Sequence, residues 1–203
     1  MIIEGRYLML TEFLIKQSQK PSGLIGRVIT KIWSFYFKKL SLWAIKQTTI
    51  SDNYRILEIG YGGGSTIKNL LALNKNLEIH GIDISKESYR TAQRVHSDSI
   101  RKGSVQLKIG NVENMPYQNN YFDRIFAIQT HIFWKDIKKS FQEVYRVLSS
   151  NSTLIIASEK EKIHYHMTDY RTSHEFSQLL TSIGFSKIEE KQNRNWILYI
   201  VYK

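Results

Sequence analysis

The chain has 203 residues, of which 42% are hydrophobic, and it carries a formal net charge of +11 with a pI near 9.7. This length can bury the core of one domain, and no stretch rich in proline, glycine or serine divides it. The chain contains no cysteine, which excludes disulfides, thiolate metal sites and a cysteine nucleophile.

The first predicted element is a basic amphipathic helix over residues 24–46. Its apolar face carries Ile25, Ile29, Ile32, Trp33, Tyr36, Leu40 and Trp43. Its opposite face carries Arg27, Lys31, Lys38, Lys39 and Lys46. Three interpretations stay open: a helical cap of residues 1–50 over a substrate pocket, contact with an anionic membrane surface, or contact with nucleic acid. The net charge favours nucleic acid only weakly, because lysine is frequent along the whole chain.

Glu4 and Glu12 interrupt the apolar residues at the N-terminus. No cleavage site is clear, and no uninterrupted apolar run is long enough to span a bilayer. We therefore expect a cytoplasmic protein.

Residues 54–83 predict a strand, a glycine-rich turn, a helix and a second strand. The first strand covers 54–59, and glycine then stands at positions 60, 62, 63 and 64. A helix over 65–74 leads to a strand over 77–82 that ends in Asp83, 23 residues after Gly60. In this arrangement the main chain of the turn approaches a ligand and the acid binds two ribose hydroxyls. The pattern therefore predicts a cofactor that contains a nucleoside.

The turn also indicates which kind of cofactor it binds. A dinucleotide fingerprint would require glycine at position 65, where this chain has Ser65, and no Gly-Lys-Ser/Thr follows for a P-loop. Glu58, two residues before the first glycine, would repel a polyanion and attract an ammonium group. A cationic amino-acid moiety therefore fits this site better than phosphate does.

The rest of the chain alternates between helical and strand periodicity, which predicts an α/β fold. Further strands are predicted over 104–109, 123–129, 152–158, 185–191 and 195–202. Further helices are predicted over 85–96, 136–148 and 173–182. Asp136 is the expected N-cap of the helix over 136–148, and Thr172 and Glu175 form a capping box before the helix over 173–182. In an open α/β sheet, ligands bind beyond the carboxyl ends of the strands.

These motifs resemble those of the class I S-adenosylmethionine-dependent methyltransferases. The first motif of that family, acid-x-Gly-x-Gly-x-Gly, is matched by Glu58, Gly60, Gly62 and Gly64. Later motifs are matched by Gly81–Ser85, Gly110–Val112, Met115–Tyr117, Tyr121–Ala127, Tyr145–Leu148 and Ile183–Phe185. The resemblance covers residues 54–203, as one compact domain over 51–203. Pro21–Arg27 and Ile132–Trp134 resemble segments of a bacterial small-molecule methyltransferase subgroup.

The resemblance implies a Rossmann-like, seven-stranded, mostly parallel sheet with the last strand antiparallel, helices on both faces and extra N-terminal helices. It implies S-adenosylmethionine as the cofactor. The cofactor-binding residues would be Glu58, Gly60, Tyr61, Gly62, Gly64, Asp83, Ile84, Asn111, Val112 and Gln129. Asn111 departs from the family pattern, in which an aspartate accepts a hydrogen bond from the adenine amino group, although an amide oxygen can accept the same bond.

The expected reaction moves a methyl group to an O, N, S or C atom of a small, apolar or aromatic acceptor. Residues 129–132 read Gln-Thr-His-Ile, so the family's Asn-Pro-Pro-Tyr signature for amino groups on adenine or glutamine is missing. His131 is the candidate general base, with a role in the pocket wall as its alternative. His164 and His166 lack a third ligand of fitting spacing, so we expect no metal. An RNA acceptor, a membrane-associated lipid or quinone acceptor, and a binding module without turnover remain alternatives.

Overall fold

The structure is a computed structural model and describes residues 37–203. Its strands are β1 (Arg55–Ile59), β2 (Glu78–Asp83), β3 (Val105–Ile109), β4 (Phe122–Ile128), β5 (Leu148–Glu159), β6 (Lys187–Gln192) and β7 (Trp196–Tyr202). Its helices are α3 (Lys38–Lys46), α4 (Ser65–Leu71), α5 (Lys86–Val95), α6 (Ser97–Arg101), α7 (Ile137–Val147), α8 (Lys160–His166) and α9 (Ser173–Ile183), with a 3₁₀ turn η1 (His131–Phe133).

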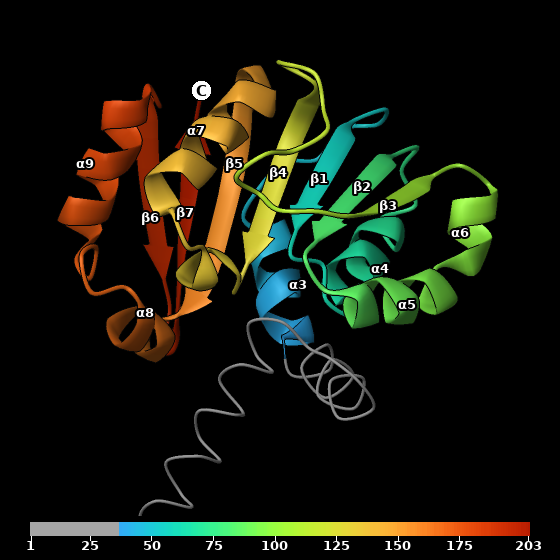
Figure 1. The fold of residues 1–203 in the computed structure, drawn as a ribbon, viewed down its shortest axis with the longest axis horizontal. Helices are drawn as coiled ribbons and strands as arrows, with labels where there is room; N and C mark the ends of the chain where they lie inside the picture. The colour runs from blue at the N-terminus through green and yellow to red at the C-terminus, as the bar shows by residue number, and fades with distance from the viewer. Residues whose placement is uncertain (1–36) are drawn as a thin grey trace, which may run out of the picture.

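The strands form one seven-stranded sheet in the order β3-β2-β1-β4-β5-β7-β6 (Figure 1). β7 runs antiparallel to both of its neighbours, and the other pairs are parallel. This arrangement confirms the predicted fold class. In the parallel register Asp83 lies beside Ile109, so β2 and β3 end at the same edge of the sheet.

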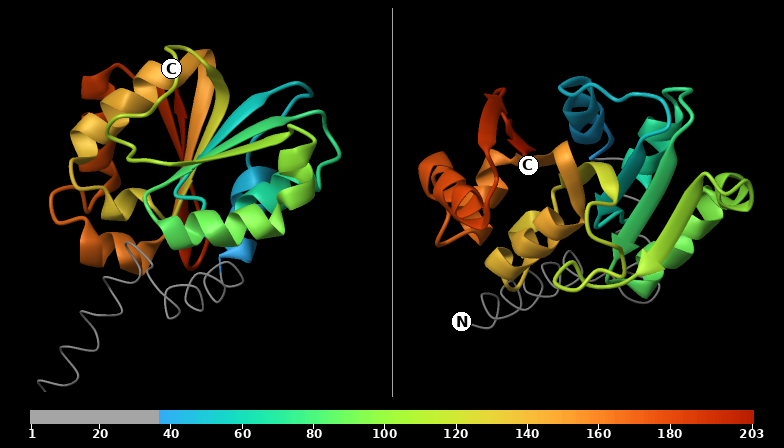
Figure 2. Two further views of the ribbon diagram at one scale, coloured as in Figure 1. Left: turned by 45° about the vertical axis from the view of Figure 1, so that its right-hand side comes forward. Right: turned by 90° about the horizontal axis from the view of Figure 1, so that it is seen from above.

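Two apolar cores lie on opposite faces of the sheet. On one face α7, α8 and α9 contribute Phe141, Val144, Ile163, Phe176 and Leu180. On the other face α3, α4 and α5 contribute Leu40, Ala44, Ile67, Leu70 and Ala92. Figure 2 shows α3 and α7 on opposite sides of the strands. Because both faces are covered, the central strands are apolar almost throughout, as in other parallel sheets.

Local signals set the helix starts that the sequence predicts. Asp136 accepts a hydrogen bond from Lys139 N at 2.9 Å and begins α7. Thr172 and Glu175 form the predicted capping box of α9. The structure adds α6, α8 and η1, which are too short for a clear periodic pattern, and it joins β3 to β4 by an irregular loop over residues 110–121.

The amphipathic segment 24–46 lies mostly outside the described residues. Its last part forms α3, in which Leu40 is buried and Lys38, Lys39 and Lys46 are exposed, as predicted. The helix also buries Ala44 and Ile45, which the prediction did not include. The proposed cap over a substrate pocket stays a prediction. Within residues 37–203, no helix has the length and apolar character needed to cross a membrane.

Candidate active site

The glycine-rich turn leaves β1 and folds back on itself. Gly60 N donates to Ile82 O at 2.7 Å and Gly64 N donates to Tyr61 O at 2.7 Å, so the turn is anchored to β2 and closed at its end. Gly62 has φ +51°, a conformation that disfavours any side chain. Among the residues described, no atom would lie within 4 Å of a Cβ built at Gly62. The turn therefore presents open space above its central glycine.

Asp83 faces this turn from the end of β2. Its Oδ2 accepts from Gly62 N at 2.8 Å, and its Oδ1 accepts from Ser85 N at 2.8 Å. Burial raises the pKa of Asp83, and these two hydrogen bonds oppose that rise. The structure therefore brings together the turn and the acid that the sequence pairs. Each carboxylate oxygen keeps a further lone pair for a ligand hydroxyl.

Glu58 lies beneath the turn with only 3% of its surface exposed. Burial raises its pKa to about 8, although hydrogen bonds from Thr66 and Ile67 N oppose the shift. Its Oε2 has no hydrogen-bond partner in the described part of the chain. The carboxyl group is therefore largely protonated at neutral pH, and a nearby cation would favour its ionised form.

Tyr61 fills space behind the turn. Its hydroxyl donates to Lys108 O at 3.2 Å. Its ring lies so close to β2 that a Cβ at Gly81 would be 2.6 Å from Tyr61 Cδ1. The resemblance counts Tyr61 among the cofactor-binding residues, and this geometry supports a packing role for its ring.

His96 was not singled out by the sequence, yet it holds the last residue of the turn. Its Nε2 lies 2.9 Å from Gly64 O, and the side chain is buried. Because a carbonyl oxygen only accepts, Nε2 carries the proton. A Cβ at Gly64 would lie 2.4 Å from the same nitrogen, so this contact requires glycine.

The β3–β4 loop contributes the remaining predicted cofactor residues. Asn111 is exposed, and its Oδ1 accepts from Glu113 N at 3.0 Å. Val112 is buried in the core. Ile84, at the end of β2, is 42% exposed, which leaves an apolar side chain open beside Asp83.

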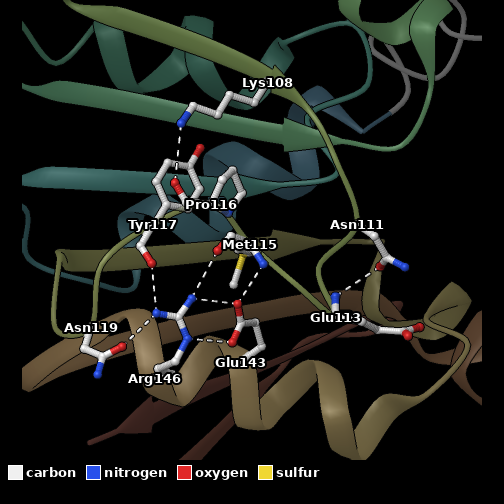
Figure 3. A network of polar contacts seen from close by, with 9 residues as sticks. All are labelled: Lys108, Asn111, Glu113, Met115, Pro116, Tyr117, Asn119, Glu143 and Arg146. Atoms are coloured by element: carbon white, nitrogen blue, oxygen red, sulfur yellow. Dashed lines mark hydrogen bonds and ion pairs between the residues drawn. The ribbon is translucent and has the colours of Figure 1, made fainter.

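An arginine–glutamate pair on α7 clamps this loop, as Figure 3 shows. Arg146 donates to Tyr117 O and Asn119 Oδ1, both at 2.8 Å, and to Met115 O at 3.1 Å. Glu143 binds the same guanidinium and accepts from Met115 N at 2.7 Å. The pairing lowers the pKa of Glu143 and raises that of Arg146. Arg146 belongs to a motif that the sequence predicts, but its role in the clamp leaves no local signal because the loop residues that it binds precede it by 27 to 31 positions.

The substitution Arg146→Gln removes the guanidinium of the clamp and should make the β3–β4 loop more mobile. We expect amide hydrogen exchange over residues 111–119 to rise and the free energy of unfolding to fall by about 1–3 kcal/mol, because several hydrogen bonds to one charged group are lost. Arg101→Gln, which breaks an exposed ion pair with Asp98, is the matched control. Unchanged exchange in Arg146→Gln would contradict the clamp.

Gln129 and His131 follow β4. Gln129 uses its Oε1 to accept from Glu159 N at 2.9 Å, which ties the ends of β4 and β5 together. His131 is 1% exposed, and neither ring nitrogen has a partner in the described part of the chain. Its ring packs 5.7 Å from that of Phe176, and burial lowers its pKa to about 3. His131 is therefore a neutral imidazole whose hydrogen-bonding groups are unused.

His164 and His166 both lie on α8. The ring of His166 packs 4.9 Å from that of Phe133. In residues 37–203, no cluster of three or more His, Asp or Glu side chains is arranged to bind a metal.

The chain is similar to known methyltransferases in sequence and in fold. The profile of a methyltransferase domain family matches residues 57–156. The uncharacterised methyltransferase YdaC of Bacillus subtilis is 28% identical over 120 residues, which are 59% of this chain and 64% of YdaC. Ajmaline N-methyltransferase of Rauvolfia serpentina is 30% identical over 103 residues, which are 51% of this chain and 35% of that enzyme. The chain thus spans less than two thirds of either relative.

A solved structure shares the fold. Phosphoethanolamine N-methyltransferase 2 of Haemonchus contortus, in complex with S-adenosyl-L-methionine, superposes with a TM-score of 0.68. It is 18% identical to this chain, and the match covers 81% of this chain and 52% of that protein.

Proposed function

The chain belongs to the class I S-adenosylmethionine-dependent methyltransferases, and we propose that it transfers a methyl group from S-adenosylmethionine to a small, apolar or aromatic acceptor. The observation that carries this proposal is the hydrogen bond between Gly62 N and Asp83 Oδ2. It joins the glycine turn to a carboxylate at the neighbouring strand end, and this arrangement supports the binding of one nucleoside cofactor through its ribose.

The residues present fit that cofactor. The space above Gly62 is open, and Asp83 is held with lone pairs to spare for ribose hydroxyls. The Glu58 Oε2 atom, which has no partner in the part of the chain that the structure describes, suits the ammonium group of the methionine moiety. Ile84 offers an exposed apolar surface to a base.

When bound, S-adenosylmethionine supplies an electrophilic methyl group and its own leaving group. The protein then needs to bind both reactants, align them and exclude water. The turn and Asp83 would fix the donor. An acceptor that carries a proton at working pH also needs a base, and one that lacks such a proton does not.

His131 is the group that we assign to the acceptor side. It follows β4 at the carboxyl edge of the sheet, and neither of its ring nitrogens has a hydrogen-bond partner among residues 37–203. A buried polar group without a partner is costly and calls for an explanation, which an acceptor hydroxyl or amine would supply. The neutral ring can accept a proton, and a negatively charged or hydrogen-bond-accepting group close to it would raise its low pKa.

We expect His131→Phe to lower kcat by about 100-fold or more, because general base catalysis typically contributes that much. The dissociation constant of S-adenosylhomocysteine should not change. The melting temperature should rise, because an apolar ring would replace an unpaired polar one among aromatic neighbours. If the variant is more stable and turns over at the wild-type rate, His131 is a packing residue only.

The acceptor class can be tested directly. Methyl-labelled S-adenosylmethionine is incubated with the full chain and a cell extract, and the label is then sorted into small-molecule, lipid, RNA and protein fractions. We expect the label among small molecules. Label in RNA would support the alternative that the net charge of +11 suggests, and label in lipid or quinone would support a membrane-associated acceptor. Tight donor binding without any label transfer would indicate a binding module.

A further inference from the structure

Asn111 stands where the base of a nucleoside would lie, an inference that rests on the proposed function. Gly110 N donates to Asp83 O at 3.0 Å, so the loop after β3 runs directly beside the acid at the end of β2. The glycine turn lies on the other side of Asp83, after β1. With a ribose at Asp83 and the amino-acid moiety at the turn, the base extends toward β3 and Asn111.

The amide of Asn111 has a defined orientation. Its Oδ1 accepts from Glu113 N at 3.0 Å, and a backbone N–H can only donate, so the oxygen must face the loop. The Nδ2 end points away from Glu113 and out of the loop, as Figure 3 shows. Among residues 37–203, the contact with Glu113 N is the side-chain hydrogen bond of Asn111, and Nδ2 makes none.

The loop is also held in place. Asn114 N donates to Asn111 O at 3.2 Å, which closes the turn that carries the side chain. Met115 lies four residues after Asn111, and its backbone N–H and C=O groups are bound by Glu143 and Arg146. Because the loop is held in this way, Asn111 presents its Nδ2 group to every ligand in the same orientation.

We propose that Asn111 reads the cofactor base as a hydrogen-bond donor, giving Nδ2–H to a ring nitrogen of adenine instead of accepting from the 6-amino group. The presented group is an amide NH₂, which has no lone pair available for another donor. An aspartate at this position would keep the contact with Glu113 N but would present a second oxygen. The residue at position 111 therefore determines which feature of the base is recognised.

The test compares wild type and Asn111→Asp by calorimetry with four ligands. These are S-adenosylhomocysteine, its 6-deamino analogue, its 1-deaza analogue and its 7-deaza analogue. We expect wild type to bind the 6-deamino analogue as tightly as the parent compound. It should lose about three- to tenfold in affinity for one of the two deaza analogues, which is the size of one hydrogen bond. Asn111→Asp should show the opposite preference, losing affinity when the amino group is removed.

Asn114→Asp is the matched control, since it adds the same charge at an exposed position of the same loop. It should keep the wild-type order of affinities. The proposal is overturned if wild type loses affinity for the 6-deamino analogue, or if both deaza analogues bind like the parent. Failure of all four ligands to bind would instead refute the proposed function.

Discussion

Asp83→Ala is expected to weaken the binding of S-adenosylhomocysteine by about 100-fold or more. The carboxylate accepts hydrogen bonds from Gly62 N and Ser85 N, each at 2.8 Å, and would also bind the ribose. Each hydrogen bond to a charged group contributes about 1.5–3 kcal/mol, so removing the acid costs both the ligand contact and the position of the turn. Titration calorimetry on the full chain measures the change.

The control for this substitution is Asp98→Ala on α6, whose carboxylate forms an ion pair with Arg101 at the surface. It should bind the ligand like wild type. Circular dichroism distinguishes loss of the site from loss of the fold, because the sheet does not depend on the Asp83 side chain. Wild-type affinity in a folded Asp83→Ala protein would refute the assignment of the cofactor site.

The sequence predicts the sheet and the cofactor side of the site because both leave local patterns. Apolar runs at strand spacing mark each strand, and the interval between Gly60 and Asp83 places a turn and an acid at neighbouring strand ends. The hydrogen bond between Gly62 and Asp83 follows from that placement.

Contacts between residues far apart in the chain leave no such pattern. Arg146 reaches Tyr117 and Met115 across the space between α7 and the β3–β4 loop, and His96 reaches Gly64 from the end of α5. Nothing in the local sequence of either residue distinguishes these contacts from solvent exposure. The orientation of the Asn111 amide is likewise set by Glu113 N, a backbone group that carries no side-chain signal.

Glu58→Gln is expected to stabilise the unliganded protein above neutral pH. The native carboxyl has a pKa of about 8, against an ordinary value of 4.5. Between these two values the unfolded chain has lost a proton that the native protein keeps, so native stability falls as pH rises, by up to about 1.4 kcal/mol per pH unit. Glutamine cannot ionise, and the difference in melting temperature between the variant and wild type should grow from pH 5 to pH 8. Glu161→Gln, at an exposed position on α8, should show no such trend.

Glu58→Gln should also weaken the binding of S-adenosylhomocysteine. An ammonium group near Oε2 favours the ionised carboxylate, so binding to the wild-type protein near pH 7 should release close to one proton. Calorimetry with S-adenosylhomocysteine in two buffers of different ionisation enthalpy measures that proton. Glu58→Gln should release none and should bind about tenfold more weakly or worse, since its amide cannot supply the charge. Glu58 is buried, and its Oε2 has no partner among residues 37–203, so its carboxylate would lower the stability of the empty protein and attract a cation. Equal proton release from the two proteins would show that the ammonium group lies elsewhere.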